Sequence, residues 1–183
     1  MKKILVLASI AMLAACNSNE PAKTDSMAPA PVDSTAQQIN SPYKIGYSSK
    51  FVMGDAKNAE TLLNLWKSWD NGDLSAAKDM FADSAELHFS DGSMIHAGRD
   101  SVIAEGQKFR NTMASSVSSV DAIMAVKSTD KDENWALIWG KEIDTDKKGK
   151  VDSSYIQETW RFNKDGKADL MFQYRQAATP PKK

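Results

Sequence analysis

The distribution of proline and aromatic residues limits where this 183-residue chain can form a core. All fifteen Phe, Trp and Tyr side chains lie between Tyr43 and Tyr174, whereas the six prolines lie at positions 21, 29, 31, 42, 180 and 181. Large apolar side chains supply most of a core, and proline lacks the N–H that helices and sheets use. We therefore expect one folded domain over residues 43–178 and a short tail over residues 179–183.

The composition argues against several classes of function. A formal charge of −1 does not suit a nucleic-acid-binding protein, which normally carries a basic surface. A single cysteine cannot form an intrachain disulfide, and with only two histidines it leaves little material for a metal site. We expect no metal, no cofactor and no nucleic-acid partner.

Residues 1–15 have the features of a secretory signal peptide. Lys2 and Lys3 precede an apolar run that is shorter than the roughly 20 residues needed to span a bilayer. The segment that ends it, Leu13-Ala14-Ala15-Cys16, resembles the lipobox of bacterial lipoproteins. In that class the signal peptidase cuts before the cysteine and the thiol carries diacylglycerol. The resemblance implies a lipid on Cys16; in an ordinary signal peptide this cysteine would be incidental.

Residues 16–42 are predicted to form the lipidated cysteine and a disordered tether. They are rich in Asn, Ser, Ala, Pro, Thr and Gln and contain no aromatic side chain, so they cannot bury enough apolar surface to fold. We expect this segment to hold the domain at a membrane of the bacterial cell envelope. The residue after the cysteine, Asn17, does not indicate whether the protein lies in the inner or the outer membrane. It also does not indicate whether the protein faces the periplasm or the cell surface.

Within the domain, periodicity predicts helices and then strands. Apolar residues recur at helical spacing after an N-cap candidate, Asp55. Asn71-Gly72 ends that helix, Asp73 caps a shorter helix, and Gly98-Arg99-Asp100 opens a third. A hairpin around Asp91-Gly92 and four later strands give the order α-α-β-β-α-β-β-β-β, with the later strands at about 116–127, 134–144, 151–162 and 167–176.

Several short motifs in this order resemble the nuclear-transport-factor-2-like (SnoaL-like) superfamily. They are Trp66 with Asp70-Asn71-Gly72-Asp73-Leu74, Phe81-Ala82-Asp83-Ser84-Ala85, Gly98-Arg99-Asp100-Ser101-Val102, and Trp160-Arg161-Phe162-Asn163-Lys164-Asp165-Gly166-Lys167. The resemblance implies an α+β fold in which a curved antiparallel sheet wraps around three helices as a cone. Its members include isomerases, dehydratases, cyclases and non-catalytic modules, so the fold does not choose the function.

Ketosteroid isomerases of this fold suggest where catalytic groups would lie. The resemblance implies an Asp base, a Tyr on the first helix and a protonated acid on a late strand. Matching the motifs places these positions at Phe89, Leu65 and Glu158. Two of the three are apolar, so we do not expect isomerase chemistry of this type. Glu158 is the one remaining catalytic candidate.

Resemblance and strand alternation together give a set of ligand-binding candidates: Trp66, Phe89, Glu158, Trp160, Met171 and Gln173. Glu158 shares a strand face with Trp160, and two roles stay open for it. It is either a polar anchor for a ligand or a structural acid paired with Arg175, Lys141 or a backbone donor.

The last strand has two alternative orientations. Simple alternation puts Leu170, Phe172 and Tyr174 inward. The family match instead sends Met171 and Gln173 to the pocket and leaves Phe172 and Tyr174 on the convex face, a common dimer surface in this superfamily. That orientation predicts a homodimer.

The predicted hairpin decides whether the two histidines can ligate one metal ion. A two-residue Asp91-Gly92 loop pairs His88 with Ile95 and Leu87 with His96, which puts the histidines on opposite faces. On that register they cannot ligate one metal ion.

The leading hypothesis is a lipid-anchored envelope protein with a non-catalytic domain that binds a small apolar molecule or a protein partner. One alternative is an isomerase- or lyase-like enzyme that uses Glu158 with His96 or Tyr155. Another is a dimeric structural or interaction module.

Overall fold

A computed structural model describes residues 35, 36 and 38–177 of the chain. The predicted signal peptide, Cys16, most of the tether and the tail lie outside the described residues. The elements in chain order are β1 (Phe51–Met53), α1 (Ala56–Asn71), the 3₁₀ helix η1 (Ser75–Met80), β2 (Phe81–His88), β3 (Met94–Gly98), α2 (Arg99–Arg110), β4 (Met113–Ser128), β5 (Glu133–Asp146), β6 (Val151–Phe162) and β7 (Ala168–Ala177).

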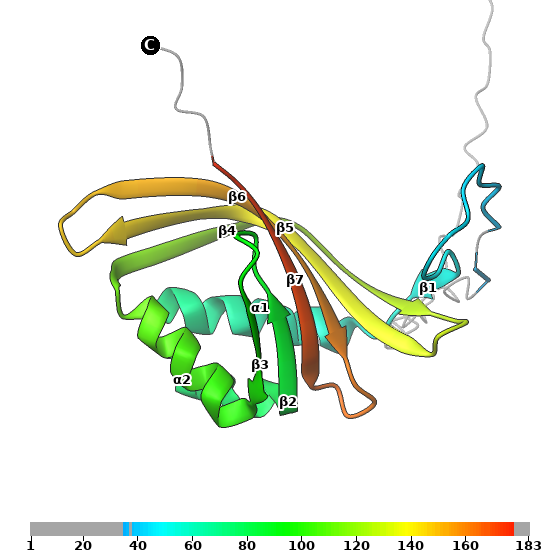
Figure 1. Cartoon of the computed structure of the whole chain (residues 1–183), viewed down its shortest axis with the longest axis horizontal. Coiled ribbons are helices and arrows are strands. Elements are labelled where there is room, and N and C mark those ends of the chain that lie inside the picture. The colour runs from blue at the N-terminus through cyan, green and yellow to red at the C-terminus, as the bar shows by residue number, and fades with distance from the viewer. Residues whose placement is uncertain (1–34, 37, 178–183) are drawn as a thin grey trace, which may run out of the picture. The chain divides into compact units, whose positions relative to one another are not determined.

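The strands form one curved, open sheet in the order β1-β4-β5-β6-β7-β2-β3. Both α-helices lie on its concave side (Figure 1). The expected α+β class is confirmed, but the expected antiparallel sheet needs a correction. β2 runs parallel to β7, with Leu87 opposite Met171, and every other neighbouring pair is antiparallel. A parallel pair needs a long connection, and β2 is joined to β7 through β3, α2 and strands β4 to β6.

Local sequence signals account for α1. The Asp55 side chain accepts a hydrogen bond from the Lys57 N–H at 2.9 Å, as an N-cap does. Gly72 ends the helix with φ +77°, a conformation that glycine adopts without steric cost, and its N–H donates to the Trp69 carbonyl. Leu62 and Leu65 are buried on the face toward the sheet. Both predicted ends of this helix are confirmed.

Two local predictions differ from the structure. The second helix is a 3₁₀ helix, and its N-cap is Leu74 instead of Asp73. Asp73 accepts hydrogen bonds from the Ser75 N–H and hydroxyl, so it orders the turn before the helix. The short strand β1 was not predicted, because it exists only through pairing with β4, where Phe51 lies opposite Ser128.

The β2–β3 hairpin has a different register from the predicted one. The Phe89 N–H donates to the Ser93 carbonyl and the Gly92 N–H to the Phe89 carbonyl, so the loop contains residues 90–92. Gly92 has φ +85°, whereas Asp91 accepts hydrogen bonds from Ser93. A three-residue loop with glycine in the left-handed position is a common alternative to the two-residue turn.

This shift overturns the predicted placement of the histidines. His96 lies opposite Glu86 and His88 opposite Met94, so both histidines face the convex side. Nevertheless, no group of three or more His, Cys, Asp or Glu side chains in the described part of the chain is arranged to hold a metal ion.

The core lies between the helices and the concave face of the sheet. Its fully buried side chains include Leu62, Ile138, Phe162 and Met171. The convex side holds a smaller apolar contact, in which Tyr47 packs edge-on against the buried Trp135 with ring centroids 6.1 Å apart. Within residues 38–177, none of the helices is both long enough and apolar enough to cross a bilayer.

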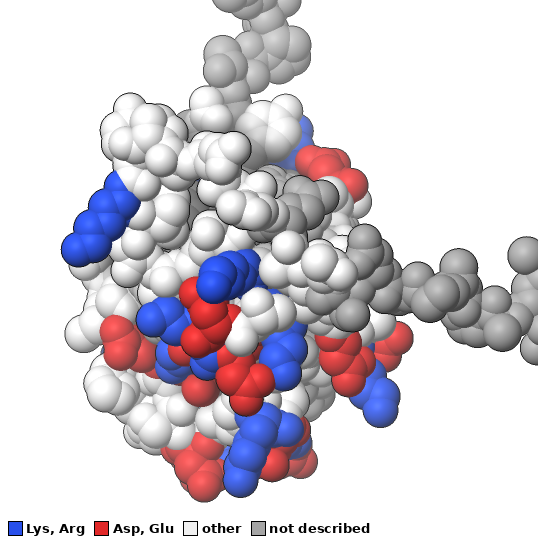
Figure 2. Space-filling model, turned by 90° about the vertical axis from the view of Figure 1, so that its right-hand side faces the viewer, with Lys and Arg blue, Asp and Glu red and all other residues white. Residues whose placement is uncertain are grey.

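Charged side chains of both signs are intermixed on the face shown in Figure 2. A basic stripe suited to nucleic acid does not appear on that face.

Candidate functional site

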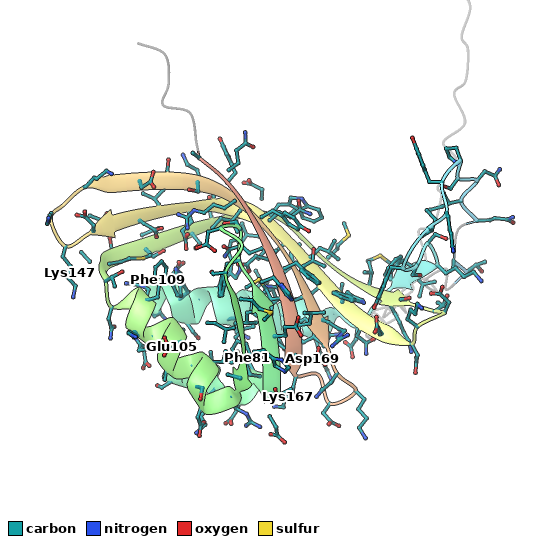
Figure 3. The ribbon with its side chains drawn as sticks, viewed as in Figure 1. Phe81, Glu105, Phe109, Lys147, Lys167 and Asp169 are labelled. Carbon is teal, nitrogen blue, oxygen red and sulfur yellow. The ribbon has the colours of Figure 1, made fainter. Side chains whose placement is uncertain are left out.

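A cavity of about 580 Å³ lies between the concave face of the sheet and the helices. We call it the cone pocket. Its walls come from α1, η1, α2 and strands β2 to β7, and most of its lining side chains are apolar. Figure 3 labels three of them, Phe81 at the start of β2 and Glu105 and Phe109 on α2.

The structure places all six predicted ligand-binding residues around this one pocket: Trp66, Phe89, Glu158, Trp160, Met171 and Gln173. Leu65 lines it as well. Met171 and Gln173 therefore face inward, as the family match predicted. Phe172 lies on the convex face, where its ring stacks on His88 at a centroid distance of 4.9 Å.

Four other residues lie outside the pocket, on the convex face of the sheet. Trp135 and Trp139 occupy alternate positions of β5 that point away from the cone, as Tyr155 does on β6. His96 also faces the convex side. The expectation that His96 or Tyr155 assists Glu158 is therefore wrong.

Glu158 is a buried carboxylate with three side-chain donors. Its Oε2 accepts hydrogen bonds from Trp66 Nε1 at 2.7 Å and from Trp160 Nε1 at 2.8 Å, and its Oε1 accepts one from Gln173 Nε2 at 2.9 Å. These donors are neutral side chains, so the partners of Glu158 are not the Arg175 or Lys141 that one of the two open alternatives named; Arg175 pairs with Glu142 and Asp144 instead. Lys141 lies instead over the Tyr155 ring on the other face.

A glycine on β5 allows Trp66 to reach Glu158. A Cβ at Gly140 would lie 2.3 Å from the Ser119 carbonyl oxygen and 2.9 Å from Trp66 Cζ3. Both distances are shorter than side chains tolerate, so only glycine lets the indole lie this close to the strand. The glycine thus helps to set the direction of the Trp66 N–H.

A second polar group, which the sequence analysis did not identify, lies beside Glu158. We call Glu142, Asp144 and Arg175 the acid–arginine cluster. Arg175 Nη1 is 3.3 Å from Glu142 Oε2, and Arg175 Nη2 is 2.9 Å from Asp144 Oδ2. Ser116 donates to Glu142 Oε1 at 3.2 Å and in turn accepts from Trp69 Nε1 at 3.1 Å. Glu142 and Arg175 line the cone pocket.

Burial raises the pKa of Glu142 from its ordinary value of 4.5 to about 7. The neighbouring negative charge of Asp144 and, less strongly, that of Glu158 act in the same direction, whereas Arg175 and the Ser116 hydroxyl oppose the change. Near neutral pH this carboxyl group therefore exists in both protonation states. It can donate a hydrogen bond when protonated, or hold a positive charge when ionised.

Helix contacts fix the wall opposite the sheet. Arg110 is buried, and its Nε donates to the Trp69 carbonyl at 2.7 Å, which ties α2 to the end of α1. The rings of Trp69 and Phe109 stack with centroids 6.1 Å apart. These contacts hold aromatic side chains of both helices at the pocket.

One signal in the sequence pointed to the acid–arginine cluster. The residues that alternate with Trp135, Leu137 and Trp139 on β5 are Ala136, Ile138 and Gly140, followed by Glu142 and Asp144. All five face the concave side. Small residues such as Ala136 and Gly140 at alternate positions of a strand are typical of a face that packs closely against a helix.

No protein-family model and no curated protein matches the chain. Solved structures do resemble it. An NTF2-like protein of unknown function from Burkholderia pseudomallei has a TM-score of 0.54 and 19% identity over 67% of this chain and 92% of its own. An LEH-like epoxide hydrolase from M. tuberculosis has a TM-score of 0.56 and 11% identity over 66% of this chain and 84% of its own.

A third similar structure is a protein with a ketosteroid isomerase-like fold from Catenulispora acidiphila, solved in complex with trimethylamine. It has a TM-score of 0.52 and 12% identity over 63% of this chain and 84% of its own. Identities this low establish the fold alone. The sheet order, the helices on its concave face and these similarities agree: the chain has the nuclear-transport-factor-2-like fold.

Proposed function

We propose that this chain is a lipid-anchored protein of the bacterial cell envelope whose domain binds a small, mostly apolar molecule in the cone pocket. The observation that carries the proposal is the pocket itself. Its volume of about 580 Å³ lies in the range of ligand sites, roughly 300–1,000 Å³. Its walls are mainly apolar and aromatic, with a few fixed polar groups, which is the usual composition of such sites.

The anchoring part of the proposal rests on the sequence. Cys16 is the one cysteine of the chain and follows an apolar run after two lysines. Each buried methylene of an acyl chain contributes about 0.8 kcal/mol to membrane binding, so more than one chain on this cysteine would anchor the protein stably.

Two pocket residues favour binding without isomerase chemistry. Phe89 and Leu65 line the pocket at the positions where the family resemblance implies a base and a hydroxyl donor. Neither side chain can accept or donate a proton.

A second candidate function is acid–base catalysis, and one observation favours it. Glu142, with a pKa of about 7, lies in the same pocket as Glu158, whose oxygens accept three hydrogen bonds. Such a pair could supply a proton donor and an acceptor for a bound epoxide or enone. Turnover of such compounds that is abolished by Glu142→Gln would establish it in place of a purely binding role.

We also propose that the convex face forms a homodimer, the structural role named above. Tyr155 and Tyr174 are 51% and 61% exposed there, beside the half-buried Phe172. Exposed aromatic side chains on adjoining strands are typical of an interface.

The binding proposal is tested by native mass spectrometry of the full protein extracted from its own membrane. Ile95→Trp replaces an aliphatic side chain of the pocket wall, on the edge strand β3, with a bulkier indole ring. His96→Trp is the matched control, because the neighbouring side chain points to the other face. We expect a noncovalent ligand on the wild type and on His96→Trp that is absent from Ile95→Trp.

Two outcomes would contradict the proposal. One is a wild-type mass with no noncovalent adduct, and the other is an adduct that Ile95→Trp retains in full. Circular dichroism of both variants separates loss of ligand from loss of fold. The native mass spectra also report the mass of the lipid on Cys16.

A further inference from the structure

We infer that the ligand of the cone pocket carries a positive charge, as an amine or ammonium group on an apolar body. The inference rests on the proposed binding function and names the chemical class of its ligand. Three observations support it: the excess of acidic side chains at the pocket, the aromatic walls, and the neutral partners of Glu158.

The charges at the pocket are unequal. Of the described residues that line it, Asp91, Glu105, Glu142 and Glu158 are acidic, whereas Arg175 alone is basic. Asp91 and Glu105 are exposed, and Glu105 lies 3.7 Å from Lys108. Glu142 and Glu158 are only 6% and 7% exposed. The excess of negative charge is therefore in the buried part of the site.

Arg175 cannot neutralise this group of acids alone. It contacts both Glu142 and Asp144, and Asp144 Oδ1 is buried without a hydrogen-bond partner among the described residues. Glu158 has indole and amide donors instead of a cation. Buried carboxylates without a paired charge are costly, so a cation in the pocket would stabilise the site.

Other charged groups on the surrounding elements do not supply that cation. On α1, Asp70 accepts a hydrogen bond from Ser118 at 2.8 Å. On α2, the buried Arg110 binds the carbonyls of Trp69 and Asp70. On β6, Asp152 lies opposite Asp144 and adds a further negative charge at the exposed end.

The walls suit an organic cation better than a hydrated metal ion. The aromatic rings that line the pocket belong to Trp66, Trp69, Phe81, Phe89, Phe109 and Trp160. Aromatic faces attract ammonium groups, and they pack against the apolar carbons around the charge. A neutral apolar ligand would use the same walls but would leave Glu158 with neutral partners only.

Because Glu142 titrates near neutral pH, binding of a cation can be detected as a release of protons. In the empty pocket the excess negative charge is relieved in part because Glu142 holds a proton up to a pH of about 7. Burial is the main cause of this raised pKa, and the charged groups that add to it or oppose it are Asp144, Arg175 and Glu158. A bound cation favours the ionised carboxylate, so binding should release a proton when the solution pH is below 7.

The test uses three probes with one apolar body: 4-phenylbutylamine, 4-phenylbutanol and 4-phenylbutyrate. At pH 6.5 the first is a cation, the second neutral and the third an anion. Their affinities are measured by isothermal titration calorimetry on the full protein in phosphatidylcholine nanodiscs, with empty nanodiscs as the blank. We expect the amine to bind about tenfold or more tightly than the alcohol, and the carboxylate to bind least.

Proton release is read from titrations in buffers of different ionisation enthalpy. The amine should release a proton at pH 6.5 and the alcohol should not. Glu142→Gln should abolish that release and reduce the preference for the amine. Glu86→Gln, on the opposite face of the sheet, should leave both unchanged.

The outcomes separate this inference from the proposed function. If the alcohol or the carboxylate binds as tightly as the amine or more tightly, the inference that the ligand is positively charged is wrong, but the proposed binding function still stands. Amine binding without proton release in the wild type would also overturn the inference. If none of the probes binds and the native mass spectrum carries no adduct, the binding function itself fails.

Discussion

Replacing Glu142 by glutamine should change how the stability of the protein depends on pH. Glutamine has nearly the shape of the protonated side chain, can still accept from Ser116, and carries no charge at any pH. The substitution therefore isolates the consequence of burying an ionisable group at this position.

The magnitude follows from the pKa of Glu142, which rises from 4.5 to about 7 on folding. The folded protein holds this proton more tightly than the unfolded chain. Its contribution to stability is thus fully present below pH 4.5 and is lost as the pH rises to 7 and above. A tenfold change in affinity corresponds to about 1.4 kcal/mol, so the full difference is roughly 3 kcal/mol.

The assay is urea unfolding of the full protein, followed by tryptophan fluorescence at several pH values between 4 and 9 at constant ionic strength. Relative to the wild type, Glu142→Gln should gain about 3 kcal/mol between pH 4 and pH 8.5. Glu60→Gln, an exposed position on α1, is the control and should gain less than about 0.5 kcal/mol. A Glu142→Gln difference that is constant across this range, or that falls with pH, would refute the reasoning.

Three further predictions follow from the anchor, the buried carboxylate and the convex face. Cys16→Ser should move the protein from the membrane fraction to the soluble fraction, and incorporation of a labelled fatty acid should disappear; a variant that stays membrane-bound and labelled contradicts the lipid anchor. Trp160→Phe removes one donor to Glu158 and should cost about 1–3 kcal/mol in urea unfolding, more than Trp139→Phe on the other face; an equal cost would count against the hydrogen bond. Tyr174→Glu should convert a dimer to a monomer in sedimentation equilibrium, and a wild-type monomer would exclude the proposed interface.

Local signals were sufficient for both ends of α1 and for the start of α2 after Gly98. Asp55 and Gly72 each act through neighbouring residues, so the limits of α1 follow from a few positions of sequence. The inward direction of Met171 required the family resemblance, because simple alternation puts Leu170, Phe172 and Tyr174 inward instead.

The remaining features depend on contacts between distant segments. The hairpin register depends on whether Asp91 and Gly92 both adopt positive φ, and the sequence Asp-Gly is compatible with loops of two lengths. Glu142, Asp144 and Arg175 meet only because β5, β6 and β7 are neighbours in the sheet. Their separation in the sequence hides the cluster.

A crystal structure of the protein purified from its own membrane, without added ligand, would test the central claim most directly. The account predicts non-protein density in the cone pocket, in contact with Trp66 and Trp160, with its polar end within hydrogen-bonding distance of Glu142 or Glu158. A cone pocket closed by rearranged side chains, or one that holds only ordered water, would contradict it.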